Sequence, residues 1–550
     1  MKYLLRVESI NFKDTITDTN DLSTIRGGGL RSLNVAAGVL ELHNSDNELS
    51  KIYVGASQGL FEFLAASPVD AESLRSRARA NIEKSFPELT VTVELAPSTE
   101  DQPFNQTLAQ LEAQSRWAQL QSPSLVFPGE GDDVCHFDRI RPSASTTYRK
   151  GAAYAQELPV RVPISNHTES RRTYGIGSKH QQFYTDNAAT QEDQQFASDL
   201  DQISDLPSFP KLHHKIALIY LDGNQFGSTF RRCNRLDFER LSNLVIANSN
   251  SWLRHTLGKL ISAPGPVTNS AAALPSTPFT WSGKVTTNAG QQLQKRDSLR
   301  VETLMWGADE IVWALPAWAG WWWLEQFYQL WGATNPWQGI GTSRVFPFTP
   351  ASCSEDKKEV KSEDFHMTFG ASIVFCHHDA PIHDIWHLAE GLAKSPKRVK
   401  ENRFAYQVLE SFDDLGDEAD KLRALRLPPE LAPDPKNALD WLVLPGNRMT
   451  IIRSAVNNIQ SLLPRSAVHE IAVKLCRDQR LEDALKLASK HLVRNKAEAL
   501  FRSLIDSIFN LPSDSIPSKQ QQAAAWIHLC DLWDYLPPVT WGIPPVEPAQ

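Results

Sequence analysis

The feature that most constrains the fold is an order of predicted elements that occurs twice along the chain. In the first copy, two apolar runs within residues 50–65 flank Gly55-Ala56-Ser57-Gln58, which is typical of a β-hairpin. A strand and a helix precede this hairpin, and a helix and a strand follow it. The order β-α-β-β-α-β predicts a ferredoxin-like unit. Its other elements are expected at 2–10 (strand), 27–42 (a helix opened by Gly27-Gly28-Gly29), 70–86 (helix) and 89–95 (strand).

The second copy begins with KIALIYLD (215–222), a strongly apolar strand with a Gly223-Asn224 turn at its end. Residues 262–297 are rich in Pro, Ser, Thr and Gly, so they are expected to form an inserted loop, and 332–364 a second loop. A helix is expected at 237–260 and a hairpin at 300–314, with a Trp-rich helix directly after the hairpin. A strand at 367–375 and a helix at 382–394 complete the unit.

The two predicted hairpins can be aligned. The first reads VGASQGLFEFLAA (54–66) and the second reads WGADEIVWALPA (306–317), so the Gly-Ala pairs coincide. Where the second copy has Asp309 and Glu310, the first has the uncharged Ser57 and Gln58. We interpret this as a duplicated unit whose first copy has lost its acids. The alternative is coincidence, since a Gly-Ala pair is common.

The predicted fold class is α+β, with two ferredoxin-like units in tandem, the first degenerate, followed by an α-helical C-terminal domain. A chain of 550 residues has room for about three to five domains. The expected parts are 1–97 (first unit), 98–205 (polar linker or insert), 206–410 (second unit) and 411–550 (helical domain).

Composition excludes several classes of protein. Hydrophobic residues make up 41% and the net charge is −8, which argues against a disordered chain and against non-specific nucleic-acid binding. Six Cys without a CxxC motif do not form a disulfide scaffold. The N-terminus has no apolar core of signal-peptide length, and Pro316 and Glu325 interrupt the most apolar stretch, 311–331. We therefore expect a cytoplasmic protein without a membrane partner.

Three carboxylates stand out in the second unit. Asp222 ends its first strand, and Asp309 and Glu310 lie at the tip of its hairpin. In a ferredoxin-like sheet the first and third strands are neighbours, so these side chains should converge at one end. Converging carboxylates repel each other unless a cation is present, and hard oxygen ligands favour Mg²⁺ or Mn²⁺. The alternative is that Asp222 is an ordinary turn residue and that Asp309 and Glu310 form a solvated hairpin tip.

Two such ions could activate a ribose hydroxyl, hold a triphosphate and stabilise the leaving pyrophosphate. Gly223 and Gly307 would let the backbone approach phosphates. Lys394, on the last helix, is placed to meet the triphosphate. A basic stretch extends from it through Lys397, Arg398, Lys400 and Arg403.

These motifs resemble those of a known family. The segments are YLDGNQFG (220–227), WGADEIVW (306–313), MTFGASIVFCHHDAPI (367–382) and LAEGLAKSPKRVKENR (388–403). They look like the palm domain of the large subunit of type III CRISPR effector complexes, which is similar to GGDEF diguanylate cyclases. The resemblance covers about 215–410, and the N-terminal unit looks like the degenerate first palm of the same proteins.

The resemblance implies a nucleotidyltransferase that joins ATP into cyclic oligoadenylates with two Mg²⁺ or Mn²⁺ ions. By position, Asp222, Asp309 and Glu310 would bind metal, Gly223 would offer its carbonyl, and Lys394 would touch phosphate. The candidate nucleotide-binding residues are Asn224, Gly227, Gly307, Ala308, Lys394, Lys397, Gly28 and Gly29.

The chain departs from the family pattern at several points. Gly-Ala-Asp-Glu replaces Gly-Gly-Asp-Asp, and Asn224 replaces an acid. The chain starts directly at the first palm, so we expect no N-terminal nuclease domain of the HD type. Cys135-His136-Phe137-Asp138, with Arg141-Pro142, looks like a remnant of the zinc element between the palms, and we do not expect it to bind zinc.

In the related cyclases two domains face each other, each with one nucleotide, and two palms in one chain would supply that pair. The acid-free copy would hold an acceptor nucleotide and the acidic copy would perform the chemistry. The loop 18–21 and a helix start at Arg26-Gly27-Gly28-Gly29 could contact the second nucleotide, because helix N-termini favour phosphate. The alternative is a plain helix cap.

Other motifs carry weaker signals. His378-Asp379, His383-Asp384 and the spacing of His383 and His387 could belong to a metal site, but they fall where the palm family has a loop and a helix start. Eight Trp between 306 and 337 are better explained by core packing than by base stacking. An irregular zinc set, also not expected, would consist of Cys135, His136, His167 and His180.

The leading hypothesis is an enzyme that makes a cyclic oligonucleotide or dinucleotide signal for antiviral defence. Its partners would be ATP or other nucleoside triphosphates, guide-RNA effector subunits or target RNA, and a downstream effector activated by the cyclic product. The main rival is an inactivated scaffold that binds RNA or other effector subunits, and a weaker one is a template-dependent polymerase.

Overall fold

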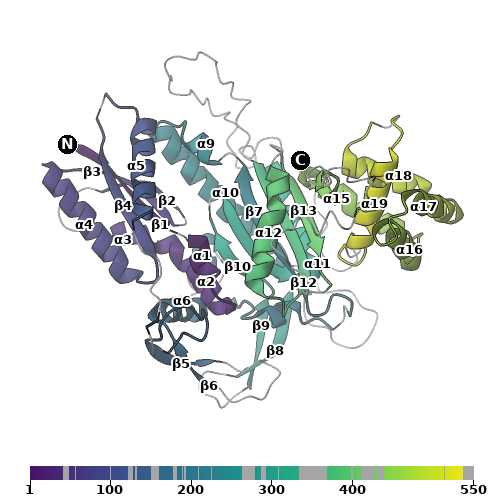
Figure 1. Cartoon of the computed structure of the whole chain (residues 1–550), viewed down its shortest axis with the longest axis horizontal. Helices are drawn as coiled ribbons and strands as arrows, with labels where there is room; N and C mark the ends of the chain where they lie inside the picture. The colour runs from purple at the N-terminus through teal and green to yellow at the C-terminus, as the bar shows by residue number, and fades with distance from the viewer. Residues whose placement is uncertain are drawn as a thin grey trace.

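The chain has a mixed α/β fold in a computed structural model, with two sheets side by side and helices at one end (Figure 1). The N-terminus lies at the far end of the first sheet. The described residues are 1–10, 12–40, 49–55, 57–99, 101–121, 128–129, 133–149, 160–177, 183–188, 190, 194–207, 210–224, 226–262, 279–286, 293–307, 309–332, 368–397, 401–410, 427–428, 430, 439–512 and 514–536.

The first sheet has four antiparallel strands in the order β2-β3-β1-β4. This is the order that a ferredoxin-like unit requires, and it places the first and third strands at the centre. Its strands are β1 (Lys2–Ile10), β2 (Ser50–Gly55), β3 (Gln58–Leu64) and β4 (Thr90–Pro97). Alternate residues of β1 face two separate cores: Tyr3, Leu5 and Val7 pack with helix α4 (Pro68–Ser85), and Leu4 faces the opposite side.

The prediction that the glycine triplet opens a helix is wrong. Asp21 caps helix α2 (Leu22–Arg31) by accepting from the Thr24 backbone N–H, so the glycines lie in the second half of the helix. They are buried because neighbouring backbone touches them. A Cβ on Gly27 would lie 1.8 Å from the Arg171 carbonyl oxygen, and one on Gly29 would lie 1.9 Å from the Leu304 carbonyl oxygen. The short elements around α2 are α1 (Phe12–Ile16), a 3-10 turn (Ser32–Asn34) and α3 (Ala37–Leu40).

The segment after β4 contains more regular structure than a linker would. Helix α5 (Phe104–Gln119) covers the face of the first sheet that carries Leu4. The other elements of the segment are β5 (Ser145–Arg149), β6 (Val160–Ile164), α6 (Asn166–Gly177), α7 (Thr185–Ala188) and α8 (Leu200–Ser204). Strands β5 and β6 and helix α6 lie below α2 in Figure 1, whereas α7 contacts helix α10 (Arg235–Ser262) and α8 contacts strands β7 (Lys215–Asn224) and β11 (Glu310–Pro316).

The second sheet repeats the topology of the first. Its order is β10-β11-β7-β12-β13-β14, and the first four strands correspond to β2-β3-β1-β4. Strand β13 pairs with β12 in parallel, which sequence analysis missed because it assigned that segment to a basic stretch. The strands are β7 (Lys215–Asn224), β10 (Glu302–Trp306), β11 (Glu310–Pro316), β12 (Thr368–His377), β13 (Arg403–Val408) and β14 (Val443–Pro445).

Helices cover both faces of this sheet, so β7 is buried on each side. Ala217, Ile219 and Leu221 share one core with α10 (Arg235–Ser262) and α11 (Ala317–Gly332). Ile216, Leu218 and Tyr220 share the other with α12 (Ile382–Lys397). A short helix, α9 (Phe226–Phe230), follows β7.

Part of the predicted loop at 262–297 is instead a β-hairpin, formed by β8 (Thr280–Thr286) and β9 (Leu293–Leu299). Its strands pair at every position from 280 to 286. The second predicted loop, 332–364, lies outside the described residues except for its first residue.

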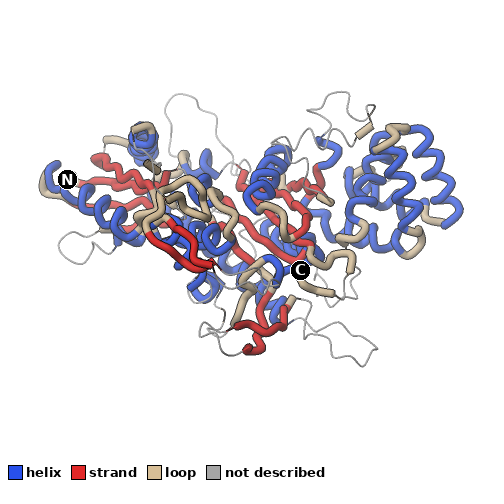
Figure 2. Tube along the Cα trace, turned by 60° about the horizontal axis from the view of Figure 1, so that its bottom comes forward, coloured by secondary structure: helices blue, strands red, loops and turns tan. Residues whose placement is uncertain are grey.

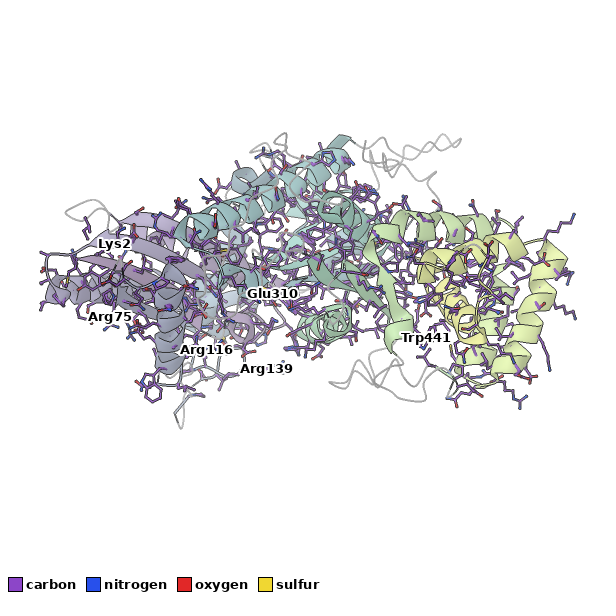
Figure 3. All side chains as sticks on the ribbon, turned by 90° about the horizontal axis from the view of Figure 1, so that it is seen from above. Lys2, Arg75, Arg116, Arg139, Glu310 and Trp441 are labelled. Carbon is purple, nitrogen blue, oxygen red and sulfur yellow. The ribbon has the colours of Figure 1, made fainter. Side chains whose placement is uncertain are left out.

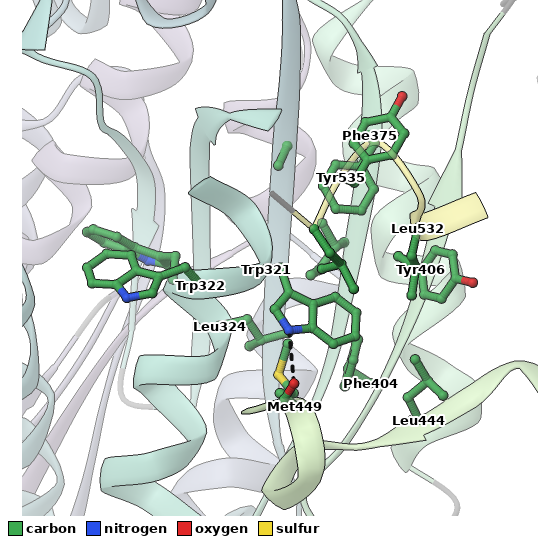
Figure 4. Close-up of a cluster of buried hydrophobic side chains, with 14 of the residues drawn as sticks. Trp321, Trp322, Leu324, Phe375, Phe404, Tyr406, Leu444, Met449, Leu532 and Tyr535 are labelled. Atoms are coloured by element: carbon green, nitrogen blue, oxygen red, sulfur yellow. Dashed lines mark hydrogen bonds between the residues drawn. The ribbon is translucent and has the colours of Figure 1, made fainter. Parts of the chain in front are cut away.

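The described tryptophans of α11 are core residues, as expected. Trp318, Trp321, Trp322 and Trp323 are each at most 1% exposed, which leaves no ring surface for base stacking. The Trp321 indole donates to the Met449 carbonyl oxygen at 3.3 Å, and this contact attaches the C-terminal helices to the sheet (Figure 4).

The C-terminal helices form a bundle at the end of the molecule opposite the N-terminus (Figure 2). They are α15 (Met449–Gln460), α16 (Arg465–Cys476), α17 (Leu481–Asn495), α18 (Glu498–Phe509) and α19 (Lys519–Leu532), preceded by 3-10 turns at Leu439–Leu442 and Gly446–Arg448. In the part of the chain that the structure describes, no helix has the length and apolar character to cross a membrane.

Candidate functional site

Asp222 and Glu310 lie directly opposite each other in the second sheet. They are register partners in the antiparallel pair of β7 and β11, so both side chains project from the same face. This confirms that the first and third strands are neighbours here. Glu310 lies near the middle of the molecule, between Lys2 in the first sheet and Trp441 beside the C-terminal helices (Figure 3). Both carboxylates are partly exposed and can be reached by a ligand.

The turn before β11 brings Asp309 to the same place. The Gly223 backbone N–H donates to the Asp309 carbonyl oxygen at 2.6 Å, and the Gly307 N–H donates to the Glu310 carbonyl oxygen at 2.8 Å. A Cβ on Gly223 would lie 2.5 Å from the Phe226 ring and 3.0 Å from the Asp309 Cβ. Gly223 is therefore required for this close approach of the β7 end to the turn.

Mutual repulsion of the carboxylates affects their protonation. The surrounding protein reduces the hydration of Asp309, and the negative charges of Asp222 and Glu310 add to this, so its pKa is raised to about 6. Asp309 nevertheless keeps exposed surface, so it remains accessible to a cation. Burial also raises the pKa of Asp222, against the opposing effect of Lys397. A divalent ion would relieve this repulsion.

Two lysines contact the carboxylates in this structure. The Lys397 ammonium binds Asp222. Lys13, in α1 of the first unit, lies 2.8 Å from a Glu310 carboxylate oxygen and 3.0 Å from one of Glu390. Sequence analysis missed Lys13, because nothing in the local pattern of α1 indicates a contact with a distant strand.

The convergence is less tight than predicted. Among the described residues, Asp222, Asp309 and Glu310 do not form a group whose oxygens all lie within 4.8 Å of one another. The side-chain partners explain this. Lys397 holds Asp222, whereas Lys13 and the Tyr220 hydroxyl hold Glu310.

The predicted phosphate-binding residues fall into different environments. Lys394 and Gly227 are exposed, whereas Lys397 is bound to Asp222. Asn224 is 3% exposed, and its amide donates to the Thr368 hydroxyl at 2.9 Å, so its side chain faces the interior.

Other candidates fare differently. Because Gly28 and Gly29 are buried within α2, the argument from a helix N-terminus does not apply to them. Ala308, Arg398 and Lys400 lie outside the described residues, and Arg403 pairs with Glu401 at the start of β13.

A cavity of about 250 Å³ lies between the two units. Its walls include Gly55 and Gly307, the first residues of the two aligned Gly-Ala pairs, together with Asn34, Tyr174, Ser249 and Trp306. The volume is slightly below the usual range for small-molecule sites, roughly 300–1,000 Å³. The pKa of Tyr53, in β2, is raised first by burial and then by the charge of Asp309. The first hairpin is thus within electrostatic reach of the acidic turn.

The first unit is not free of acids at the matching positions. Glu8 is the register partner of Gln58, just as Asp222 is the partner of Glu310. Glu8 therefore occupies the position of Asp222, where it forms an ion pair of 2.5 Å with Arg6. Sequence analysis missed it because only the hairpins were aligned.

The segment proposed as a zinc-element remnant contains a polar network. Asp138 is enclosed by hydrogen bonds from the Thr168 hydroxyl (2.6 Å) and the Ile140 backbone N–H (2.9 Å), and Arg141 bridges it to Asp18. The Cys135 thiol is 3.6 Å from the Thr168 hydroxyl. Asp18, Asp138 and His167 do cluster, but arginines already neutralise the acids. His180 lies outside the described residues.

This network predicts an acid-sensitive insert. Burial alone would raise the pKa of Asp138, but hydrogen bonds from Thr168, Arg141 and Ile140 outweigh it and lower the pKa to about 2. Asp138 therefore contributes stability above the ordinary aspartate pKa, about 2 kcal/mol, and loses it as pH falls from about 4 through 2. Amide exchange of α6 peptides should show a gap between wild type and Asp138→Asn at pH 5 that narrows toward pH 2.5. A gap independent of pH would contradict this assignment.

Comparison with known proteins gives structural neighbours only. No protein-family model matches the chain, and no curated protein matches it. The chain is similar to the structure described as a Csm1-Csm4 cassette in complex with one ATP, at 10% identity and a TM-score of 0.46, over 97% of this chain and 70% of that chain.

Two further neighbours cover less of the matched chains. A Csm1-Csm4 subcomplex of the type III-A CRISPR-Csm interference complex matches at 11% identity and TM-score 0.39, over 73% of this chain and 54% of that one. Csm1 in T.onnurineus matches at 10% identity and a TM-score of 0.40, over 73% of this chain and 52% of that chain. The chain thus spans about half the length of these two. These structures carry the names of Csm1 and of a type III-A CRISPR-Csm complex, the kind of complex to which the sequence motifs showed a resemblance.

Proposed function

We propose that the chain is a divalent-metal-dependent nucleotidyltransferase that joins ATP, or other nucleoside triphosphates, into a cyclic oligonucleotide. The observation that carries the proposal is the pairing of Asp222 with Glu310 across β7 and β11, with Asp309 on the adjoining turn. The two sheets with matching strand order would be two palms, the second catalytic and the first degenerate.

The donor set suits Mg²⁺ or Mn²⁺. Three carboxylates, two of them with raised pKa, offer only hard oxygen ligands, which these ions prefer. A bound pair of ions would supply activation of a hydroxyl and stabilisation of the leaving pyrophosphate. Asp222, Asp309 and Glu310 would hold the ions, and the Gly223 carbonyl is a further candidate ligand.

The residues around the carboxylates would orient the substrate. Lys397 is within reach of a triphosphate once it leaves Asp222, and the exposed Lys394 lies one turn before it on the same helix. Gly307 leaves the turn open toward the cavity between the units. That cavity, which both hairpins line, would receive the base or ribose of a second nucleotide, so that the first unit presents the acceptor.

Incubation of the purified chain with Mg²⁺ or Mn²⁺ and each nucleoside triphosphate tests the proposal, with products identified by chromatography and mass spectrometry. A cyclic product supports it and identifies the base. Binding of nucleotide without turnover would indicate a missing activator, such as target RNA or another effector subunit. Absence of both binding and turnover with either metal would refute it.

A second function deserves its own test because Lys397 and Lys13 already neutralise two of the three carboxylates. This arrangement favours a scaffold in which lysines replace the metal. Such a scaffold would bind other effector subunits or RNA, with the C-terminal helices as one contact surface. It would bind its partner equally well in EDTA and would carry Asp222→Asn without loss.

Lys397 provides a sharper prediction. Lys397→Met leaves Asp222 without its cation, so Mn²⁺ affinity without nucleotide should rise, while the KM for nucleoside triphosphate should also rise because a phosphate contact is lost. Lys394→Met separates the two effects, since it should raise KM without changing Mn²⁺ affinity. Electron paramagnetic resonance of Mn²⁺ and steady-state kinetics measure both quantities. Equal effects of the two variants on Mn²⁺ binding would contradict the role of Lys397.

A further inference from the structure

A second group of metal-binding side chains lies at the other end of the second sheet. Asp201 is in α8, His214 immediately precedes β7 and His378 immediately follows β12. Because β7 runs from Lys215 toward Asp222, this group is separated from Asp222 by eight residues, or roughly 26 Å of extended strand. It is therefore distinct from the carboxylate site.

The distances within the group suit a metal better than hydrogen bonds. The Asp201 Oδ1 lies 3.5 Å from His214 Nδ1 and 3.8 Å from His378 Nε2, and all three atoms lie within 4.8 Å of one another. Hydrogen bonds between such groups measure about 2.7–3.2 Å. Ligand atoms at about 2.1 Å from a tetrahedral Zn²⁺ are about 3.4 Å apart. The group is thus spaced like a set of ligands, with little movement needed.

The backbone holds the two histidines together. The His378 N–H donates to the His214 carbonyl oxygen at 2.9 Å, and the His214 N–H donates to the Ser204 carbonyl oxygen at 3.1 Å. His214 adopts a left-handed conformation with φ of 62°, which costs conformational energy for a residue with a Cβ. These contacts link the end of α8 to the start of β7 and the end of β12.

A carboxylate also contacts one of the two histidines, on the side of the ring away from Asp201. Asp379 Oδ1 lies 3.3 Å from His378 Nδ1, the ring nitrogen that does not face Asp201. Metal-binding histidines commonly have such a partner, which fixes the tautomer and orients the ring.

A second layer surrounds the group. The His213 ring lies 3.7 Å from that of His214, and its Nε2 is 3.1 Å from Asp205 Oδ1. Arg300 is nearby, and its guanidinium donates to the carbonyl oxygens of Gln202, Ile203 and Asp205. The positive charge of Arg300 repels a cation bound at this group. An ion held mainly by bonds to imidazole nitrogens is therefore favoured over an ion held by electrostatic attraction alone.

We propose that Asp201, His214 and His378 form a binding site for Zn²⁺ or a similar transition-metal ion, with water as the fourth ligand. Two imidazoles and one carboxylate match the ligand preference of zinc rather than that of Mg²⁺. The ion joins the insert to both strand ends. Sequence analysis noted His378 but set it aside, because it falls where the palm family has a loop and a helix start, and it did not identify Asp201 or His214 as partners.

The test uses the full-length chain after removal of metals with a chelator. Zn²⁺ is titrated against a chromophoric competitor, and Co²⁺ replaces it for visible absorption spectroscopy. We expect one equivalent of Zn²⁺ to bind and Co²⁺ to give the intense bands of tetrahedral coordination. His214→Ala and His378→Ala should each lower the affinity at least about tenfold, and Asp379→Asn by about ten- to a hundredfold. His383→Ala, which removes a histidine that contacts Asn20 and Asp384, is the matched control.

The result is decisive even if an alanine variant folds poorly. Asp201→Asn keeps the shape of the side chain and should shift the Co²⁺ spectrum while circular dichroism stays unchanged. Stoichiometric binding that is insensitive to these variants, or no stoichiometric binding at all, overturns the proposal. Asp309→Asn should leave Zn²⁺ binding intact, which separates this proposal from the nucleotidyltransferase activity.

Discussion

Asp309→Asn should abolish nucleotidyl transfer while leaving the fold intact. The substitution preserves size and the backbone bond from Gly223, but it removes the charge that a metal would bind. We expect turnover to fall by at least about a hundredfold, the scale on which single electrostatic contacts to a transition state act. Because burial, and then the charges of Asp222 and Glu310, raise the pKa of this carboxyl, the apo protein should become slightly more stable at neutral pH when the charge is removed. Product formation and the melting temperature measure the two effects.

The first unit supplies a matched control. Glu8→Gln removes the carboxylate at the position that corresponds to Asp222, where Arg6 already pairs with it. This variant should retain most of the activity if the second unit carries the chemistry. Full activity of Asp309→Asn, or equal losses in the two variants, would contradict the site assignment.

Arg26→Met should cause the largest loss of stability. Arg26 and Glu302 form an ion pair between α2 and β10, with side chains 3% and 0% exposed. The guanidinium also donates to the carbonyl oxygens of Gly175 (3.1 Å) and Ser198 (3.0 Å). Removing the cation leaves Glu302 charged and buried, which costs about 3–5 kcal/mol. Calorimetry should show a large decrease in the melting temperature.

Two further variants define the origin of this effect. Arg26→Met with Glu302→Met should recover much of the loss, because no uncompensated charge remains. Arg75→Met removes a partly exposed ion pair with Glu72, and it should change stability by less than about 1 kcal/mol. A double variant as unstable as the single one would show that packing, rather than charge, dominates at Arg26.

The sequence predicted the second sheet well because its signals are local. The run 215–222 is apolar on both faces, and the turn at 307–310 carries its own glycine, so each element is specified by adjacent residues. The topology then predicted that Asp222 and Glu310 lie at the same end of the sheet, but not that they are register partners. The strands of the first unit and its helix α4 were predicted for the same reason, whereas the helix expected at 27–42 was not found with those bounds.

The remaining features depend on contacts between distant segments. Lys13 reaches Glu310 from another unit, and His214 meets His378 only because β7 and β12 are neighbours. The glycine triplet was wrongly assigned to the start of a helix. Glycine is suited both to the start of a helix and to a close contact in the middle of one, and the local sequence does not distinguish the two roles. Strand β13 was missed because its apolar residues follow a basic run that suggested phosphate binding.

The glycines of α2 have a mechanical consequence. Backbone packs directly against backbone at three points, Gly27 with Arg171, Gly175 with Ser23, and Gly29 with Leu304, so at these points no side chain separates the elements. Side-chain rotation cannot absorb a displacement there. The insert, α2 and β10 must therefore move together as one rigid block, and any opening of the cavity between the two hairpins has to come from bending elsewhere, in the turns themselves.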